Sequence, residues 1–202
     1  MKKQYYVAYG SNLNKEQMKR RCPGAGLVGI GQIRDYELQF RGYPQGAFAT
    51  IIPKKGASVP VGVWKIDRAN ERSLDLYEGV PNHYFKQSIP VVLQNGQKIL
   101  AMVYVMNQQA KIGLPTAHYY KTVQQGYLDC GLDLSFLNTA LLTSFDHFYG
   151  TRFETGENMP IPWVAESATE YDEESGETTD AFEDSRIVDD EDEEVDPWQM
   201  QW

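Results

Sequence analysis

The sequence predicts an α+β fold, because signals for β-strands dominate its first half and amphipathic helices follow them. Two short helices, expected at residues 15–21 and 68–77, interrupt the strand signals, and two longer ones follow at 117–130 and 134–148. The strand signals are short runs rich in aromatic and β-branched residues, at 5–9, 27–33, 36–40, 47–52, 59–66, 84–93 and 98–106. This order favours a curved sheet covered by helices.

The first strand leads into a polar turn. Residues 5–9 alternate aromatic and small apolar side chains, which is typical of a buried strand. Gly10 breaks the strand, and Ser11 and Asn12 then lead into the short helix at 15–21. A strand that stops ahead of a helix in this way gathers backbone N–H groups that suit a carboxylate or an oxyanion. The alternative is an ordinary strand–loop–helix connection.

A carboxylate stands at the end of the second predicted helix. Asp67 is expected to cap the helix at 68–77, and Gly79 is expected to end it. Glu78 then lies where the partial negative charge of the helix terminus disfavours an ionised carboxylate. Burial would act in the same direction and raise its pKa toward a value that suits a general base. Alternatively, Glu78 is a surface residue that precedes a glycine.

The later strands and helices carry clear boundary residues. Asn95 and Gly96 tolerate positive φ and predict a hairpin between the last two strands. Pro90 lacks an N–H donor and indicates an edge or a bulge on the first arm of that hairpin. Pro115 precedes the helix at 117–130, and Gly131 ends it.

No cofactor or metal is expected. Residues 24–29 match the pattern G-x-G-x-x-G, but a helix precedes them and a strand follows, the reverse of the dinucleotide-binding order. The three histidines, His83, His118 and His147, show no ligand spacing, and the chain has no Cys/His cluster.

The charge of the chain is divided unevenly. The 202 residues carry a net charge of −9, which combines +6 for residues 1–165 with −15 for residues 166–202. Residues 189–194 are six consecutive acidic side chains, which repel one another and cannot bury a core. We therefore expect a domain at 1–150, a connector at 151–165 and an acidic, disordered tail at 166–202. The tail also holds two tryptophans, so a motif that docks on a protein partner is an alternative.

Composition predicts a soluble, cytoplasmic protein. Its two cysteines, Cys22 and Cys130, cannot form a disulfide framework, and free thiols are expected, although a single bridge remains open. Lys2 and Lys3 are followed by no apolar segment of the kind found in signal peptides, and no apolar run approaches transmembrane length. Neither a membrane nor a nucleic acid is expected as a partner.

Several motifs together resemble one family. Tyr9-Gly10-Ser11-Asn12-Leu13, after an apolar strand, is similar to the signature of the γ-glutamylcyclotransferase, or AIG2-like, family. Residues 74–80 resemble the catalytic segment of that family. Further similar segments occur in the same order at 49–53, 61–64, 102–106, 119–121, 126 and 130–132. The resemblance extends from about residue 5 to 150 and implies a small barrel-like mixed β-sheet flanked by helices.

The resemblance also implies a reaction. The α-amine of a small γ-glutamyl compound attacks its own γ-carbonyl, which yields 5-oxoproline and releases an amine or an amino acid. Glu78 would take a proton from the α-ammonium group and later protonate the leaving nitrogen. Tyr104 would contact the substrate through its hydroxyl, whereas packing is the expected role of Tyr84. The expected substrate-binding residues are Tyr6, Tyr9, Gly10, Ser11, Asn12, Leu13 and Tyr104.

Two other functions remain open from the sequence. The family's fold also suits a module that binds a small molecule without turning it over. The acidic tail, which lies outside the family pattern, could instead make the protein an adaptor or decoy for a basic partner. Glu78 favours the enzyme, because a poorly solvated carboxylate is costly unless it has a use.

Overall fold

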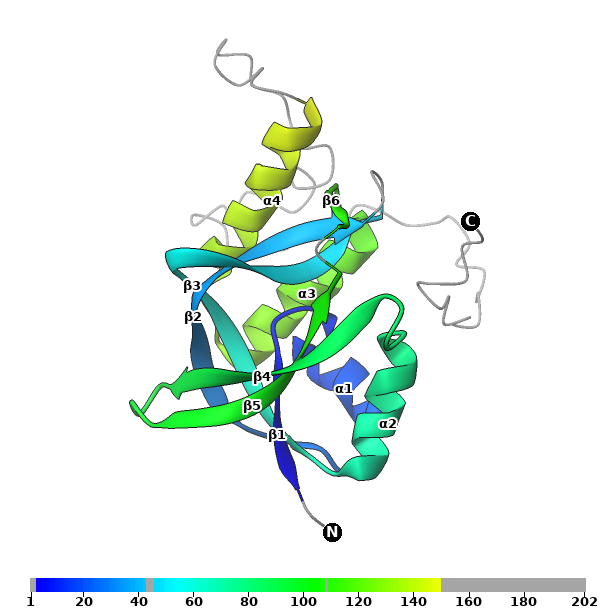
Figure 1. Cartoon of the computed structure of the whole chain (residues 1–202), viewed down its shortest axis with the longest axis vertical. Helices are drawn as coiled ribbons and strands as arrows, with labels where there is room; N and C mark the ends of the chain where they lie inside the picture. The colour runs from blue at the N-terminus through cyan, green and yellow to red at the C-terminus, as the bar shows by residue number, and fades with distance from the viewer. Residues whose placement is uncertain (1–2, 43–45, 108, 150–202) are drawn as a thin grey trace, which may run out of the picture. The chain divides into compact units, whose positions relative to one another are not determined.

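The computed structural model describes residues 3–42, 46–107 and 109–149 (Figure 1). The chain divides into two units, Met1–Glu157 and Asn158–Trp202, and the second lies wholly outside the described residues. The connector and the acidic tail predicted at 151–165 and 166–202 therefore also lie outside them.

The described strands form one mixed sheet that closes into a barrel (Figure 1). The strands are β1 (Gln4–Ala8), β2 (Gly26–Gly42), β3 (Phe48–Ile66), β4 (Tyr84–Leu93), β5 (Lys98–Met106) and β6 (Lys111–Ile112). Their order is β3-β1-β5-β4-β2-β6, and an additional pairing of β2 with β3 closes the first five. β1 runs parallel to β5, whereas the other pairs are antiparallel. The predicted α+β fold and barrel-like mixed sheet are confirmed.

Two long strands replace four short predicted ones. The runs predicted at 27–33 and 36–40 join in β2, and those at 47–52 and 59–66 join in β3. Asp35 takes a left-handed conformation, with φ of 61°, where the pairing of β2 with β3 shifts register. Its carboxylate accepts the N–H of Gly56 at 2.9 Å. These residues therefore form a bulge, where the pairing shifts register while both strands continue.

The helices lie where the sequence predicts them. They are α1 (Lys15–Arg21), α2 (Arg68–Tyr77), α3 (Ala117–Cys130) and α4 (Leu134–Tyr149), and a 3₁₀ turn, η1 (Ser11–Leu13), precedes α1. Asp67 caps α2 through a reciprocal capping box with Asn70, and Gly131 ends α3 at a φ of 66°. The two-residue strand β6 was not predicted, because so short a pairing leaves no periodic pattern.

Close packing of α3 holds η1 in place. A Cβ atom on Gly126 of α3 would lie 2.6 Å from both the Leu13 Cβ and the Asn14 backbone nitrogen. Leu13 is fully buried beneath the helix. Because glycine alone permits this approach, the position of the turn depends on Gly126.

Both cysteines are buried free thiols, as expected. The Cys22 thiol donates to the Asn70 carbonyl at 3.6 Å, and the Cys130 thiol donates to the Leu13 carbonyl at 3.5 Å. Burial raises the pKa of each thiol to about 11. Among the described helices, none has the length and apolar character needed to cross a bilayer. The cytoplasmic location stays a prediction.

Candidate active site

A pocket that is partly open to solvent lies where the chain leaves β1 and where α2 ends. Walls from β3, β4, β5 and α3 complete it. Its lining is rich in tyrosine and comprises Tyr6, Val7, Tyr9, Gly10, Ser11, Asn12, Ala49, Glu78, Tyr84, Tyr104 and Tyr119. The structure thus brings together every predicted site residue except Leu13.

The polar turn contributes Ser11 and Asn12 to the lining of this pocket. In η1 the Leu13 N–H donates to the Gly10 carbonyl at 2.9 Å, and the Asn14 N–H donates to the Ser11 carbonyl at 3.0 Å. The N–H groups of Ser11 and Asn12 consequently have no partner within the turn. A Cβ atom on Gly10 would lie 3.2 Å from both the Ala49 Cβ and the Tyr119 hydroxyl oxygen, so a larger residue would crowd the pocket wall.

Glu78 contacts this turn, although Asn12 and Glu78 are 66 residues apart in the sequence. The Asn12 Nδ2 donates to Glu78 Oε1 at 2.8 Å and to the Tyr6 hydroxyl oxygen, also at 2.8 Å. Glu78 is the C-cap of α2, and its N–H donates to the Leu74 carbonyl at 2.8 Å. The next residue, Gly79, has a φ of 61°, which ends the helix and lets the Glu78 carboxyl group reach the pocket.

Burial dominates the electrostatics of Glu78. Desolvation raises the pKa of its carboxyl group from 4.5 to about 7, and the charge of Arg21 and the hydrogen bond from Asn12 oppose this rise. Glu78 keeps some exposed surface because the pocket is open, yet protein atoms displace most water around its carboxyl group. With a pKa near 7, the group populates both protonation states at neutral pH. It can therefore both accept and return a proton there.

The pocket tyrosines are neutral hydrogen-bonding groups at neutral pH. Burial raises the pKa values of Tyr6, Tyr9, Tyr84, Tyr104 and Tyr119 above the ordinary value. The Tyr9 hydroxyl donates to the Tyr104 carbonyl at 2.6 Å, and the Tyr84 hydroxyl donates to the Ala49 carbonyl at 3.0 Å. The Tyr119 hydroxyl accepts the Ala49 N–H at 3.1 Å. Tyr84 thus packs as expected while also lining the pocket.

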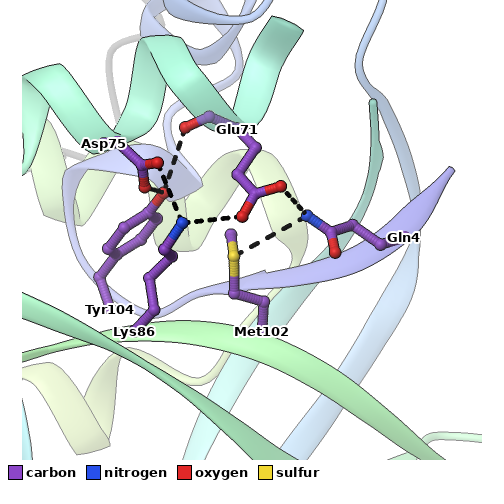
Figure 2. A network of polar contacts seen from close by, with 6 residues as sticks. All are labelled: Gln4, Glu71, Asp75, Lys86, Met102 and Tyr104. Carbon is purple, nitrogen blue, oxygen red and sulfur yellow. Dashed lines mark hydrogen bonds and ion pairs between the residues drawn. The ribbon is translucent and has the colours of Figure 1, made fainter. Parts of the chain in front are cut away.

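A polar network between α2 and the sheet holds Tyr104 (Figure 2). The Tyr104 hydroxyl donates to Asp75 Oδ1 at 2.7 Å, and its ring lies edge-on to Tyr6, with centroids 5.7 Å apart. Lys86 donates to Glu71 at 2.8 Å and to Asp75 at 2.9 Å. The Tyr104 ring therefore lines the pocket while its hydroxyl points to α2. A substrate contact through that hydroxyl stays a prediction.

Leu13 has a different place from the one predicted for it. Its side chain is fully buried against Gly62 and Gly126, and its N–H is used inside the turn. It supports the turn from below, because the apolar last residue of η1 points into the core.

Sequence reasoning did not single out two residues of the site. Tyr119 closes the pocket from α3, and Arg21, at the end of α1, donates to the Asn12 side chain. Tyr119 lies within one of the segments that resemble the family, and this resemblance could have marked it as a candidate site residue. Arg21 is the last of several basic residues in a short helix, and nothing in the sequence shows which of them faces the turn.

Comparisons with known proteins agree with this geometry. The sequence profile of the family described as "Gamma-glutamyl cyclotransferase, AIG2-like" matches residues 6–123. The γ-glutamylcyclotransferases of Bos taurus and Homo sapiens are 34% and 33% identical over 140 residues, which span 65% of this chain and 73% of each relative. A solved structure of a γ-glutamyl cyclotransferase is similar with a TM-score of 0.63 and 29% identity, covering 69% of this chain and 86% of that one. The chain therefore belongs to the γ-glutamyl cyclotransferase, AIG2-like, family.

Proposed function

We propose that this protein is a γ-glutamyl cyclotransferase that forms 5-oxoproline and releases an amine or amino acid from a small γ-glutamyl compound. The observation that carries the proposal is the 2.8 Å hydrogen bond between Asn12 and Glu78. It joins the polar turn to a carboxyl group of raised pKa at a pocket that is partly open to solvent.

The Glu78 carboxylate begins the reaction as a base. It takes one proton from the α-ammonium group of the substrate, because an amine attacks only after it has lost that proton. The freed nitrogen then bonds to the γ-carbonyl carbon, which closes a five-membered ring and places negative charge on the carbonyl oxygen.

Collapse of this intermediate breaks the bond between the γ-carbon and the leaving nitrogen. Glu78 returns its proton to that nitrogen, and the ring nitrogen loses a second proton, which the released amine takes up. Of the three ammonium protons, one stays on the lactam and two end on the product amine. Glu78 is thereby restored as a carboxylate.

The turn and the tyrosines supply position and charge stabilisation. The N–H groups of Ser11 and Asn12 would hold the α-carboxylate or the oxyanion, both of which suit convergent backbone donors. The tyrosine rings would hold the substrate in the conformation that closes the ring. Such pre-organisation can lower the barrier by roughly 7–11 kcal/mol at best.

Product analysis tests the proposal. The wild-type protein is incubated with γ-glutamyl amino acids and γ-glutamylamines, and 5-oxoproline is detected by mass spectrometry. We expect turnover of at least one compound and a loss of about 10²–10⁴-fold in Glu78→Gln, the range typical of a general base. Glu16→Gln, which changes an exposed carboxylate on α1, is the matched control and should keep the wild-type rate. If the wild type leaves every compound intact and binds one of them tightly, the pocket is a binding site and the proposal fails.

A further inference from the structure

Arg21 lies behind the pocket wall, next to Asn12. Its Nη1 donates to Asn12 Oδ1 at 2.7 Å and to Ser11 Oγ at 3.3 Å. Its Nη2 donates to the Tyr77 hydroxyl oxygen, and the guanidinium carbon lies 3.5 Å from the centre of the Tyr77 ring. One side chain of α1 therefore contacts both the turn and the end of α2, the two segments that form the proposed site.

We infer that Arg21 is a positioning residue that fixes the orientation of the Asn12 amide, so that its NH₂ group faces the Glu78 carboxyl group. This inference rests on the proposed function, because it concerns how the side chain that hydrogen-bonds to Glu78, the proposed base, is oriented. Arg21 itself does not line the pocket.

Donor and acceptor chemistry allows one orientation of the amide. A guanidinium group has donors only, so the atom of Asn12 that faces it must be the carbonyl oxygen. The two N–H bonds of Nδ2 are then directed to Glu78 Oε1 and to the Tyr6 hydroxyl oxygen. A flipped amide would set its oxygen against the Glu78 carboxylate and its NH₂ group against the guanidinium group. The arginine thus excludes the orientation that would repel the ionised base.

Arg21 also supplies positive charge beside the base. Six of the described ionisable side chains interact electrostatically with Glu78. They are Arg21 of α1, Tyr6 of β1, Tyr9 just after β1, Tyr84 of β4, Tyr104 of β5 and Tyr119 of α3. The tyrosines are neutral at neutral pH, so Arg21 is the charged member of this described set. Its charge and the Asn12 hydrogen bond both lower the pKa of Glu78 against the effect of burial.

The way Arg21 is held fits a positioning role. Ser73 of α2 donates to the Arg21 carbonyl at 2.7 Å, which ties the end of α1 to the helix that carries Glu78. The Arg21 Nε atom is buried and has no hydrogen-bond partner among the described residues. A buried donor without a partner opposes folding, so stability alone does not account for an arginine at this place.

Three variants test the role of Arg21. Arg21→Gln removes the charge and the forked donor, whereas Arg21→Lys keeps the charge and loses the fork. Arg20→Gln removes the same charge from an exposed neighbour on α1 and is the matched control. For each folded variant, kcat/KM for 5-oxoproline formation is measured against pH. The pKa of Glu78 is measured by ¹³C NMR, with the resonance assigned through Glu78→Gln.

We expect Arg21→Gln to raise the pKa of Glu78 by at least about one unit and to move the acidic limb of the pH profile with it. Its kcat should fall by roughly 10–100-fold, on the order expected when a hydrogen bond that orients a reacting group is lost. Arg21→Lys also offers only donors to the Asn12 oxygen, so it should keep the pKa near the wild-type value and recover part of the rate, without the second bond to Tyr77. Arg20→Gln should match the wild type.

Two results would overturn the inference. One is a wild-type Glu78 pKa in Arg21→Gln, and the other is a wild-type kcat in Arg21→Gln. The NMR titration needs no turnover, so it tests Arg21 even if the wild type forms no 5-oxoproline. Absence of that product would overturn the proposed function instead.

Discussion

At the scale of single residues, Glu78 makes the fold less stable at neutral pH. Its pKa rises from 4.5 to about 7 in the folded protein, so the folded state binds the proton more tightly than the unfolded chain does. The free energy of unfolding therefore falls as the pH rises from about 4.5 through 7, and the loss persists above that range. A shift of this size corresponds to about 3 kcal/mol at most, and partial solvent access to the pocket makes the true value smaller.

Glu78→Gln should consequently stabilise the protein while it removes activity. The glutamine keeps an oxygen that can accept from Asn12 Nδ2, and it is never ionised. At pH 8 we expect a melting temperature several degrees above the wild type, at roughly 2–4 °C per kcal/mol for a chain of this size. At pH 4 the variant and the wild type should have nearly the same melting temperature. Thermal unfolding by circular dichroism at both pH values checks this, and a variant less stable than the wild type at pH 8 would contradict it.

The sequence pointed to Glu78 and to the polar turn, but not to the residues that contact them and fix their positions. Glu78 and the turn at Gly10–Asn12 stand out through helix-end position, backbone chemistry and family resemblance. Arg21 and Tyr119 do not, because their roles depend on which elements meet in space. The hydroxyl of Tyr104 is directed to Asp75, a contact across 29 residues that no local pattern reveals.

At the scale of elements, the packing of α3 on η1 sets the position of the turn. Gly126→Ala would place a Cβ 2.6 Å from Leu13 and Asn14, so the helix or the turn has to move. We expect a net loss of about 1–3 kcal/mol in the free energy of unfolding, the usual range for overpacking. This loss should appear even though alanine is intrinsically favoured over glycine in a helix by about 1 kcal/mol.

The same change should lower kcat/KM, because the Ser11 and Asn12 donors move with the turn. Denaturant unfolding and the 5-oxoproline assay measure the two effects. Gly29→Ala in β2 is the control, since its Cβ would meet nothing within 4 Å. A Gly126→Ala protein that is more stable than the wild type, with unchanged activity, would show that α3 does not hold the turn.

Most elements could be predicted because their ends carry strong local chemistry. Asp67 and Gly131 fix helix ends through side-chain capping and a left-handed residue, and both were visible in the sequence. The joining of four predicted strands into β2 and β3 was not visible. Asp35 and Gly56 resemble turn residues, but they bond to each other across two strands, and that pairing is a tertiary contact.

At the scale of the whole molecule, closure of the barrel assembles the site. β1 lies between β3 and β5, and its parallel pairing with β5 brings Tyr6 near Tyr104. Parallel pairing joins residues far apart in the chain, so strand patterns alone do not predict it. The family resemblance predicted the barrel, whereas composition and periodicity led only as far as an α+β fold with a curved sheet.

Removal of residues 166–202 tests whether the acidic segment belongs to the working enzyme. Every residue placed in the site lies between 6 and 119, so we expect chain 1–165 to keep its turnover and melting temperature nearly unchanged. Its net charge should change from −9 to +6. A large loss of activity or stability on truncation would show that the acidic segment supports the domain.

The pH dependence of kcat/KM for 5-oxoproline release tests the central claim most directly, since it reports the ionisation of the free enzyme's essential base. We predict an acidic limb with its midpoint at about 7, matching the pKa of Glu78, and the loss of this limb in the residual activity of Glu78→Gln. A midpoint near the ordinary glutamate value of 4.5 would contradict the raised pKa of the base, and a limb that survives the substitution would show that another group carries the proton.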